Sequence, residues 1–332
     1  MKNKEIALVT GAAGFIGSHV VDELVGVGVR VIAFDNLSGG FRHNVNKRAH
    51  FVKGSITDER LIARIFQKNK IDYIFHCAAY AAEGLSHFIK KFNYTNNLLG
   101  SVHLINAAVN HEVKCFVFTS SAAVYGDATT RVDEAVTPAP QDSYGIAKFA
   151  IEQELAVSHK LFGLNYVIFR PHNVYGERQN LWDTYRNVIG IFISQALEGK
   201  PCTVFGDGKQ TRAFTYVGDV APVIAQSVFN EKAYNHVFNI GAEQAYSIHE
   251  VAHTVYAIVN AEVKVSYIGT RHEALHINVS HAKLKNFLNY EPRYSLDDGL
   301  RRMIAWAKKA KPHKSKKFKH IEIFKNLPAA WV

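Results

Sequence analysis

The 332-residue chain has only three cysteines and no long apolar run. Cys77, Cys115 and Cys202 are far apart in the sequence, which gives neither a disulfide framework nor a metal-binding spacing. No apolar stretch approaches the roughly 18 residues of a membrane-spanning helix, and the N-terminal residues lack the layout of a signal peptide. We therefore expect a protein of the reducing cytoplasm, without disulfides, a metal site or a membrane partner.

Acidic residues are almost absent from the C-terminal segment. Residues 301–332 hold ten of the 39 Lys and Arg residues but only one of the 29 acids, Glu322, so most of the net charge of +10 lies there. A basic segment can bind nucleic acid or another anionic surface, but no aromatic platform or nucleic-acid motif accompanies these lysines. We interpret residues 311–332 as a solvated basic tail and expect no nucleic-acid partner.

Short β-rich runs alternate with helical patterns through the first half of the chain. The runs EIALVT, RVIAFD, DYIFHCAA and KCFVFTSS lack strict alternation, which is typical of strands covered on both faces. The helical patterns between them predict an α/β fold with a parallel, doubly wound sheet of the Rossmann type. We expect this domain over residues 1–171, with a returning segment near 213–241. Residues 172–212 and 242–310 would form a smaller α/β lobe.

The strongest local signal is the glycine turn GAAGFIG, which runs from Gly11 to Gly17 between a strand and a helix. Glycines there allow a tight turn and bring the backbone at the helix start close to a pyrophosphate. Asp35 closes the next strand, at the sequence distance expected of a ribose contact. Its carboxylate would repel a 2′-phosphate, so NAD is favoured over NADP, with nearby Arg42 as the counter-indication.

Tyr144 and Lys148 lie one helical turn apart in the motif YGIAK, on the same helix face. A free tyrosine has a pKa of about 10, too high for a base at neutral pH, and an adjacent ammonium favours the phenolate. Ser121, at the end of the run KCFVFTSS, supplies a hydroxyl that can share the transferring proton. Together with the glycine turn upstream, these three residues predict an active site rather than an ordinary amphipathic helix.

Seven motifs extend this pattern along nearly the whole chain. From Lys4 to about Leu300 they are GAAGFIGSHV, FDNLSGG, HCAA, TSSAAVYGD, SYGIAK, RPHNVYG and GDGKQTRAFTYVGDV. Together they resemble the extended short-chain dehydrogenases/reductases that act on nucleotide sugars, above all the UDP-glucose/UDP-galactose 4-epimerases and their UDP-glucuronate relatives. The resemblance implies tightly held NAD, a nucleotide-sugar lobe at residues 172–212 and 242–310, and a homodimer built by a helix bundle.

The resemblance also assigns roles to individual residues. It makes Tyr144 the catalytic base, Lys148 its partner and Ser121 the catalytic serine. The implied cofactor-binding residues are Gly11, Gly14, Phe15, Ile16, Gly17, Asp35, Asn36, Ser55, Ile56, Ala78, Ala79, Tyr144 and Lys148. The implied substrate-binding residues are Ser121, Asn173, Asn187, Phe205, Arg212 and Arg271. For Phe205, simple core packing is the alternative to a contact with the nucleobase.

The residues after Ser121 discriminate among the reactions of these relatives. The 4,6-dehydratases carry Asp-Glu where this chain has Ala122 and Ala123, the decarboxylases carry Glu at the second position, and the 3,5-epimerases use a cysteine there. Alanine cannot transfer a proton, so the resemblance favours hydride removal and return without a further step. We expect inversion at carbon 4 of a UDP-hexose through a 4-keto intermediate, interconverting UDP-glucose and UDP-galactose.

Three departures from the family pattern leave alternatives open. Ser55 replaces the carboxylate that usually approaches adenine, Glu83 lies in an atypical loop at residues 80–87, and Ala213 replaces the Asp after Arg212. A UDP-glucuronate 4-epimerase, or another nucleotide-sugar epimerase or reductase, would use the same catalytic set. From another class, a dinucleotide-sensing or nucleic-acid-binding protein would keep the fold without turnover.

Overall fold

The computed structural model describes residues 4–127, 131–183, 188–269, 279–310, 318 and 320–328, and its centre is a seven-stranded parallel sheet. The strands are β1 (Ile6–Thr10), β2 (Arg30–Asp35), β3 (His50–Lys53), β4 (Tyr73–His76), β5 (Cys115–Thr119), β6 (Tyr166–Pro171) and β11 (His236–Ile240). They lie in the order β11-β6-β5-β4-β1-β2-β3, and every neighbouring pair is parallel. The predicted doubly wound α/β fold is therefore confirmed.

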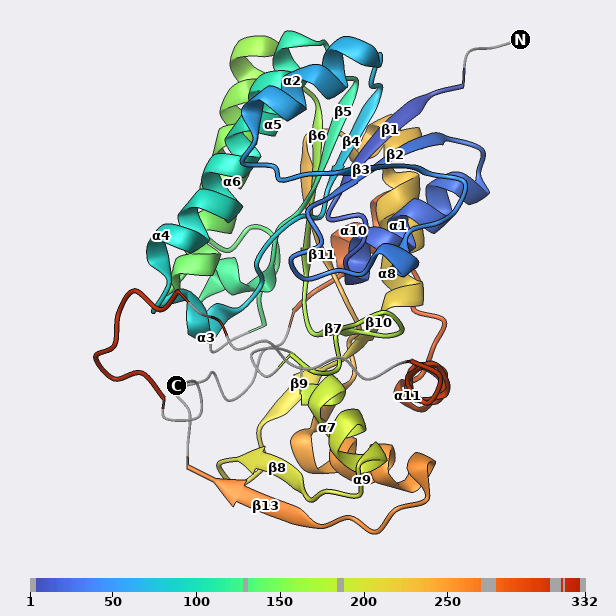
Figure 1. The fold of residues 1–332 in the computed structure, drawn as a ribbon, viewed down its shortest axis with the longest axis vertical. Helices are drawn as coiled ribbons and strands as arrows, with labels where there is room; N and C mark the ends of the chain where they lie inside the picture. The colour runs from blue at the N-terminus through green and yellow to red at the C-terminus, as the bar shows by residue number, and fades with distance from the viewer. Residues whose placement is uncertain are drawn as a thin grey trace.

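Helices cover both faces of the sheet (Figure 1). One face carries α2 (Glu59–Lys68), α5 (Gly100–Asn110) and α6 (Ser143–Phe162), and the other carries α1 (Phe15–Gly26) and α8 (Val217–Gln226). Side chains of β1 alternate between them: Ala7 and Val9 belong to the core cluster with α1, and Leu8 belongs to the cluster with α5 and α6. Because both faces are buried, the strands are apolar throughout instead of alternating.

Between β4 and α5 the chain forms short helices that later bear on the site. These are α3 (Glu83–Ser86), α4 (Lys90–Asn93) and a π-helical turn (Tyr94–Leu99) that continues directly into α5. Short 3-10 turns occupy Arg42–Asn44, Ala122–Tyr125, Ser227–Phe229 and Glu231–Ala233. Asp142 caps the start of α6 by accepting a hydrogen bond from the N–H of Gly145 at 2.8 Å, as is favoured for a helix N-terminus.

A smaller group of elements lies below the sheet in Figure 1. Its strand pairs are β7 (Val174–Tyr175) with β10 (Thr215–Tyr216), β8 (Cys202–Phe205) with β13 (Val265–Ile268), and β9 (Thr211–Ala213) with β12 (Ala245–Ser247). Its helices include α7 (Val188–Leu197) and α9 (Ile248–Val259), and α10 (Ala282–Leu288) and α11 (Leu296–Ala307) follow in sequence. The chain returns to the large sheet through α8 and β11, so the two parts interleave. The exact domain boundaries stay a prediction.

The C-terminal segment differs from the solvated tail that the sequence predicted. Phe318, Ile321 and Leu327 pack on a small apolar cluster beside α3 and α4. The buried side chains of that cluster are Ala82, Leu85 and Ile89. Figure 1 shows this red segment alongside the two helices. The prediction considered the many lysines but not the apolar side chains between them. Removal of these side chains from water is favourable and stabilises the docked segment.

The structure also locates the cysteines and shows whether the described residues form metal-ligand clusters or membrane-spanning helices. The cysteines are all free thiols, and burial raises the pKa of Cys77 to about 12. Within the described ranges, no cluster of three His, Cys, Asp or Glu residues could hold a metal ion. No helix in the same part of the chain is long and apolar enough to cross a membrane. The cytoplasmic location stays a prediction.

Candidate active site

The glycine turn joins β1 to α1 at the carboxyl edge of the sheet. Gly11 has a φ of +67°, and a Cβ there would lie 2.7 Å from the backbone N of Ala78. A Cβ at Gly17 would lie 2.2 Å from the carbonyl O of Gly11. Side chains at these positions would therefore fill the turn and push apart the backbones that form it.

The start of α1 has the properties of an anion-binding site. Gly14 is its N-cap residue, so no N-cap side chain occupies the helix start, and the first turn contains no acidic residue. Phe15 and Ile16 open the helix, half-buried against the main core cluster. Helix N-termini favour negative charge because their N–H groups and dipole point outward. The residues present thus fit the pyrophosphate of a dinucleotide.

Asp35 closes β2 directly beside the glycine turn. Its Oδ2 accepts a hydrogen bond from the N–H of Ala13 at 3.0 Å, and its Oδ1 accepts one from the N–H of Leu37 at 2.7 Å. Burial raises the pKa of Asp35, and the backbone hydrogen bonds act in the opposite direction. Asn36 caps the following loop, with its Oδ1 accepting from the N–H of Ser38 at 2.9 Å. The carboxylate is therefore held at the glycine turn by the backbone, and its contact with a ribose stays a prediction.

The residues after β3 adjoin the same edge. The N–H of Gly54 donates to the carbonyl of Asp35 at 3.0 Å, which places Ser55 next to the end of β2. Ile56 is buried, and its carbonyl O lies 3.2 Å from Nδ1 of His103. The cofactor roles of Ser55 and Ile56 stay predictions from the resemblance.

Arg42, the residue that could favour NADP over NAD, contacts an aromatic ring of β3. Its guanidinium stacks on the ring of Phe51 in β3, 4.4 Å from the ring centroid. Stacking of this kind is a favourable cation–π contact that moving the side chain would break. Together with the carboxylate of Asp35, this arrangement fits NAD better than NADP.

A buried chain of polar groups holds the backbone after β4, where Ala78 and Ala79 lie. The N–H of Ala78 donates to Oγ1 of Thr10 at 3.3 Å, and that hydroxyl lies 2.7 Å from Nδ1 of His76. Nε2 of His76 lies 2.7 Å from Oγ of Ser101, which donates its own proton to a backbone carbonyl at 2.6 Å. Burial lowers the pKa of His76 to about 3, so its imidazole is neutral. This order of donors assigns the ring proton to Nε2.

Tyr144 and Lys148 lie side by side in the first turns of α6, and both are buried. Nζ of Lys148 donates to the carbonyl O of Thr119 at 2.6 Å and lies 5.7 Å from the centroid of the Tyr144 ring. Burial lowers the pKa of Lys148 to about 8, so most of these side chains are charged at neutral pH. A positive charge is thereby fixed beside the phenol.

Ser121 reaches the same place from the end of β5. It caps the 3-10 turn that follows, with its Oγ accepting from the N–H of Ala123 at 3.1 Å. That turn packs tightly on α6, since a Cβ at Gly145 would lie 2.7 Å from the carbonyl O of Ala123. The turn that Ser121 caps therefore contacts the helix turn that carries Tyr144, and the catalytic role of Ser121 stays a prediction.

Two residues that fix the start of α6 were not predicted. Oγ of Ser86 accepts from the N–H of Tyr144 at 3.2 Å and donates to the carbonyl of Glu83 at 2.6 Å. The side-chain amide of Asn93 donates to the carbonyl of Ser143 at 2.7 Å. These contacts are made to backbone atoms, so no pairing of residue types in the sequence could reveal them.

A buried ion pair lies behind the end of β5, and the sequence did not indicate it either. Glu152 accepts from Ser120 Oγ at 2.5 Å and from Arg170 through two bonds, of 3.0 Å to Nε and 2.5 Å to Nη2. Arg170 Nη1 donates to the hydroxyl of Tyr125 at 2.8 Å, and this hydroxyl donates to Asn239 at 2.8 Å. The network joins α6, β6 and β11 to Ser120, which follows β5 and precedes Ser121.

His172 and His281 form a second buried polar contact. Their Nε2 atoms are 3.0 Å apart, and their rings are stacked with centroids 5.2 Å apart. Burial lowers the pKa of His172 to about 4 and that of His281 to about 3. Both rings are therefore neutral at pH 7, and one Nε2 can donate to the other. The pair ties the end of β6 to the residue that precedes α10.

Besides Ser121, five substrate-binding residues were expected, and three of them lie at or below the carboxyl edge of the sheet. Asn173 follows β6 with a φ of +41°, and its Nδ2 donates to the carbonyl of Ala213 at 3.2 Å. Arg212 lies in β9 next to that carbonyl, whereas Phe205 ends β8, half-buried. The other two expected residues, Asn187 and Arg271, lie outside the described residues. All five assignments stay proposals.

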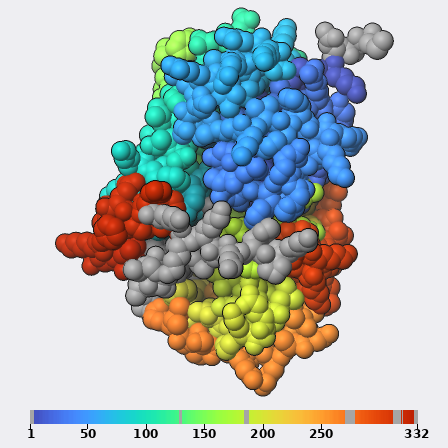
Figure 2. Space-filling view, in the orientation of Figure 1, coloured from blue at the N-terminus to red at the C-terminus, as the bar shows by residue number. Residues whose placement is uncertain are grey.

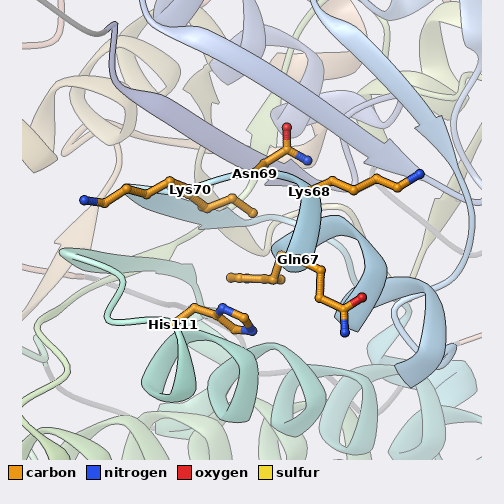
Figure 3. Close-up of a pocket in the computed structure, with 7 residues that line it drawn as sticks. Gln67, Lys68, Asn69, Lys70 and His111 are labelled. Carbon is orange, nitrogen blue, oxygen red and sulfur yellow. The ribbon is translucent and has the colours of Figure 1, made fainter.

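A surface hollow of about 310 Å³ lies away from this site (Figure 3). It is lined by residues 66–71 and His111, which precede β4 and β5 at the amino edge of the sheet. Figure 3 shows Lys68 and Lys70 pointing away from each other, so these charges do not converge on a ligand. We therefore place the chemistry at the carboxyl edge, where ligands of such sheets bind.

Comparison with known proteins agrees with this geometry. Residues 7–241 match the NAD dependent epimerase/dehydratase family. A putative UDP-glucose 4-epimerase of Methanocaldococcus jannaschii is 34% identical over 303 residues, which cover 91% of this chain and 98% of that protein. A UDP-N-acetyl-alpha-D-glucosaminuronate decarboxylase of Bacillus cytotoxicus is 32% identical, with coverage of 91% and 98%. The crystal structure of a Thermotoga maritima UDP-glucose 4-epimerase with UDP-glucose has a TM-score of 0.88 and 35% identity, and covers 92% of this chain and 99% of its own.

The family match includes the glycine turn, Asp35 and the Tyr144–Lys148 helix. The residues that the resemblance assigned to a dinucleotide thus lie within the matched region and gather at one edge of the sheet. The chain therefore belongs to the NAD dependent epimerase/dehydratase family, and is an NAD-dependent enzyme of nucleotide-sugar metabolism.

Proposed function

We propose that this enzyme is a nucleotide-sugar 4-epimerase that interconverts UDP-glucose and UDP-galactose, or a related UDP-hexose, through a 4-keto intermediate. The observation that carries the proposal is an intact set of Ser121, Tyr144 and Lys148 followed by Ala122 and Ala123. Dehydration or decarboxylation would need a further proton-transfer group beside the serine, and alanine offers none. The putative UDP-glucose 4-epimerase of Methanocaldococcus jannaschii and the UDP-glucose 4-epimerase of Thermotoga maritima, both similar to this chain, support the same reaction.

In the proposed mechanism, Oη of Tyr144 takes the proton of the sugar 4-hydroxyl and later returns it to the 4-keto oxygen. Lys148 stabilises the phenolate in between, because its ammonium is held beside the ring by the carbonyl of Thr119. The hydroxyl of Ser121 shares the moving proton from the other side. NAD, which the glycine turn and Asp35 would hold, would supply the acceptor for the hydride of carbon 4 and the source of its return to the opposite face of the sugar.

Binding is divided between the two parts of the molecule in this proposal. The glycine turn and Asp35 hold the dinucleotide on the large sheet. Asn173 and Arg212 hold the sugar diphosphate from the end of β6 and from β9, and Phe205 contacts the nucleobase. A guanidinium suits the diphosphate because its planar donors pair with phosphate oxygens. A substrate held by its diphosphate can turn its keto sugar over without leaving the enzyme.

Conversion of nucleotide sugars by the purified protein tests the proposal. We expect UDP-galactose and UDP-glucose each to give a mixture of the two, with no NAD added, because the cofactor is regenerated in every cycle. Products are resolved by chromatography after separate incubations with UDP-glucose, UDP-galactose and UDP-glucuronate.

The substrate panel also separates the alternatives. Conversion of UDP-glucuronate alone to its 4-epimer would indicate a uronate substrate instead of a UDP-hexose. UDP-glucuronate is tested because one relative is a UDP-N-acetyl-alpha-D-glucosaminuronate decarboxylase. A UDP-pentose product would contradict epimerisation, because carbon 6 would have been lost. No conversion of any sugar, both before and after NAD is added, would overturn the UDP-hexose assignment.

We further propose that the protein forms a homodimer. Its two chains would pair through α6 and through the continuous helix made of α4, the π-helical turn and α5. Ile146, Val157 and Leu161 on α6 are exposed, as is Leu99 in the π-helical turn. Ile146 and Val157 are three turns apart and share a helix face, and an exposed apolar row of this kind marks interaction surfaces.

A charged substitution in this row tests the pairing. We expect Val157→Glu to convert a dimer to a monomer in light scattering at micromolar concentration, whereas Val27→Glu, at an exposed valine elsewhere, leaves the dimer intact. A wild-type protein that is monomeric at that concentration would contradict the proposal.

A further inference from the structure

Phe318 and residues 320–328, here called the C-terminal strap, lie on the loop and short helices between β4 and α5. The Phe318 ring centroid is 4.8 Å from that of Phe92 and 5.4 Å from that of Tyr80. Ile321 and Leu327 pack on the same cluster. Figure 2 shows the red strap against the teal surface of this region. The strap thus covers a segment about 230 residues earlier in the chain.

Glu322 fixes the strap to the start of a helix. Its Oε2 accepts from the N–H of Lys91 at 2.7 Å and its Oε1 from the N–H of Phe92 at 2.8 Å. In return, the N–H groups of Glu322 and Ile323 both donate to the carbonyl of Phe88, at 2.8 and 3.2 Å. Because α4 continues through the π-helical turn into α5, the carboxylate also meets the positive end of a long helix. The only acid of residues 301–332 therefore makes this contact.

Residues 80–92, which the strap covers, also contact α6, the helix that carries Tyr144. Leu85 and Ile89 are buried in the strap cluster, and Ser86 between them accepts from the N–H of Tyr144. At the other end of the segment, Tyr80 exchanges two backbone hydrogen bonds with the side-chain amide of Asn97, at 2.7 and 3.1 Å. Residues 80–92 therefore lie between the strap and the backbone of Tyr144, and follow directly on the cofactor residues Ala78 and Ala79.

We propose that the C-terminal strap is a positioning element of the active site and that Glu322 is its main positioning residue. By capping α4 it orders residues 80–92, and through Ser86 it fixes the backbone of Tyr144 relative to the sugar. The inference about catalysis rests on the proposed epimerase function, whereas the ordering of residues 80–92 and 142–146 does not. Loss of the cap leaves two backbone N–H groups without their acceptor and frees the segment to move.

Glu322→Gln in the full-length enzyme is the first test. Glutamine keeps the size of the side chain but turns an N–H₂ group toward a backbone N–H. We expect faster amide hydrogen exchange in residues 80–92 and 142–146, and a kcat lowered about three- to tenfold, because Tyr144 is then less well positioned. NAD content and the urea midpoint of global unfolding should stay at the wild-type values, which separates positioning from general destabilisation. Lys325→Gln, at an exposed position in the same strap, is the matched control.

A chain that ends at Ala310 provides the second test. We expect it to show the same exchange and kcat defects, and a synthetic peptide of residues 311–332 to restore both, whereas the same peptide with Glu322→Gln should not. Unchanged exchange in residues 142–146 for both variants would overturn the proposal, whether or not any UDP-sugar is converted. Unchanged kcat in an enzyme whose wild type is active would overturn it as well. A wild type that converts no sugar would instead contradict the proposed function, and the exchange data would still decide the role of the strap.

Discussion

Replacing Tyr144 by phenylalanine is expected to lower kcat by about 10²- to 10⁴-fold, the usual contribution of a positioned acid–base group. The substitution removes only the hydroxyl, so the buried ring keeps its place beside Lys148. Retained NAD and the dissociation constant of the nucleotide sugar should therefore change little. The measurement is steady-state kcat with whichever UDP-sugar the wild type converts, with bound NAD determined in the same preparation.

Tyr73→Phe is the control for this experiment. The Tyr73 hydroxyl also makes a hydrogen bond, to Glu5 at 2.8 Å, but at the amino edge of the sheet. We expect this variant to keep the wild-type kcat. If Tyr144→Phe retained more than about a tenth of the activity, far above the range for a lost acid–base group, another residue would have to be the base.

Removing one partner of the Glu152–Arg170 pair is expected to destabilise the fold by about 3–5 kcal/mol, because the remaining charge is left buried without compensation. Both side chains are almost fully buried. Burial acts to lower the pKa of Arg170, but its hydrogen bonds and ion pair with Glu152 outweigh this and raise the pKa overall. The ion pair therefore compensates the burial of both charges, and Arg170→Met, which leaves the carboxylate of Glu152 buried without its partner, should show the effect in urea denaturation.

A double substitution separates the pair from its surroundings. In Glu152→Leu/Arg170→Met no buried charge is left unpaired, so the loss of unfolding free energy should be smaller than in either single variant. Arg301→Gln removes one partner of an exposed pair with Asp297 and should change stability little. An Arg170→Met variant as stable as Arg301→Gln would show that the buried pair does not stabilise the fold.

Motifs close together in the sequence predicted much of the site. The glycine turn, Asp35 and the pair of Tyr144 with Lys148 act within one or two neighbouring elements, and the regular order of strands and helices brings those elements to one sheet edge. Parallel strands end at the same edge of the sheet, so Ser121 after β5 could be placed near the glycine turn after β1. The apolar runs predicted the sheet for the same reason, since burial on both faces removes alternation.

Contacts between distant segments were not predictable in this way. Ser86 is a common residue in a loop without a motif, and its partner is a backbone N–H. In the sequence, Glu152 and Arg170 are simply two charged residues. Nothing there indicates that both are buried and form an ion pair. The strap was interpreted from its lysines as solvated, although three apolar side chains and one acid decide where it docks.

The sequence by itself determined the fold class, the family and the residues proposed for hydride chemistry. The fold class, the family and these residues depend on local spacing, on the period of apolar residues and on short motifs. Each of these features lies within a short segment of the sequence. Only the tertiary structure decided which contacts surround those residues: the polar chain through His76, the buried pair bonded to Ser120, and residues 80–92 between the strap and Tyr144. Such contacts form between groups that meet only after folding, and their strength comes from burial, which the linear sequence does not contain.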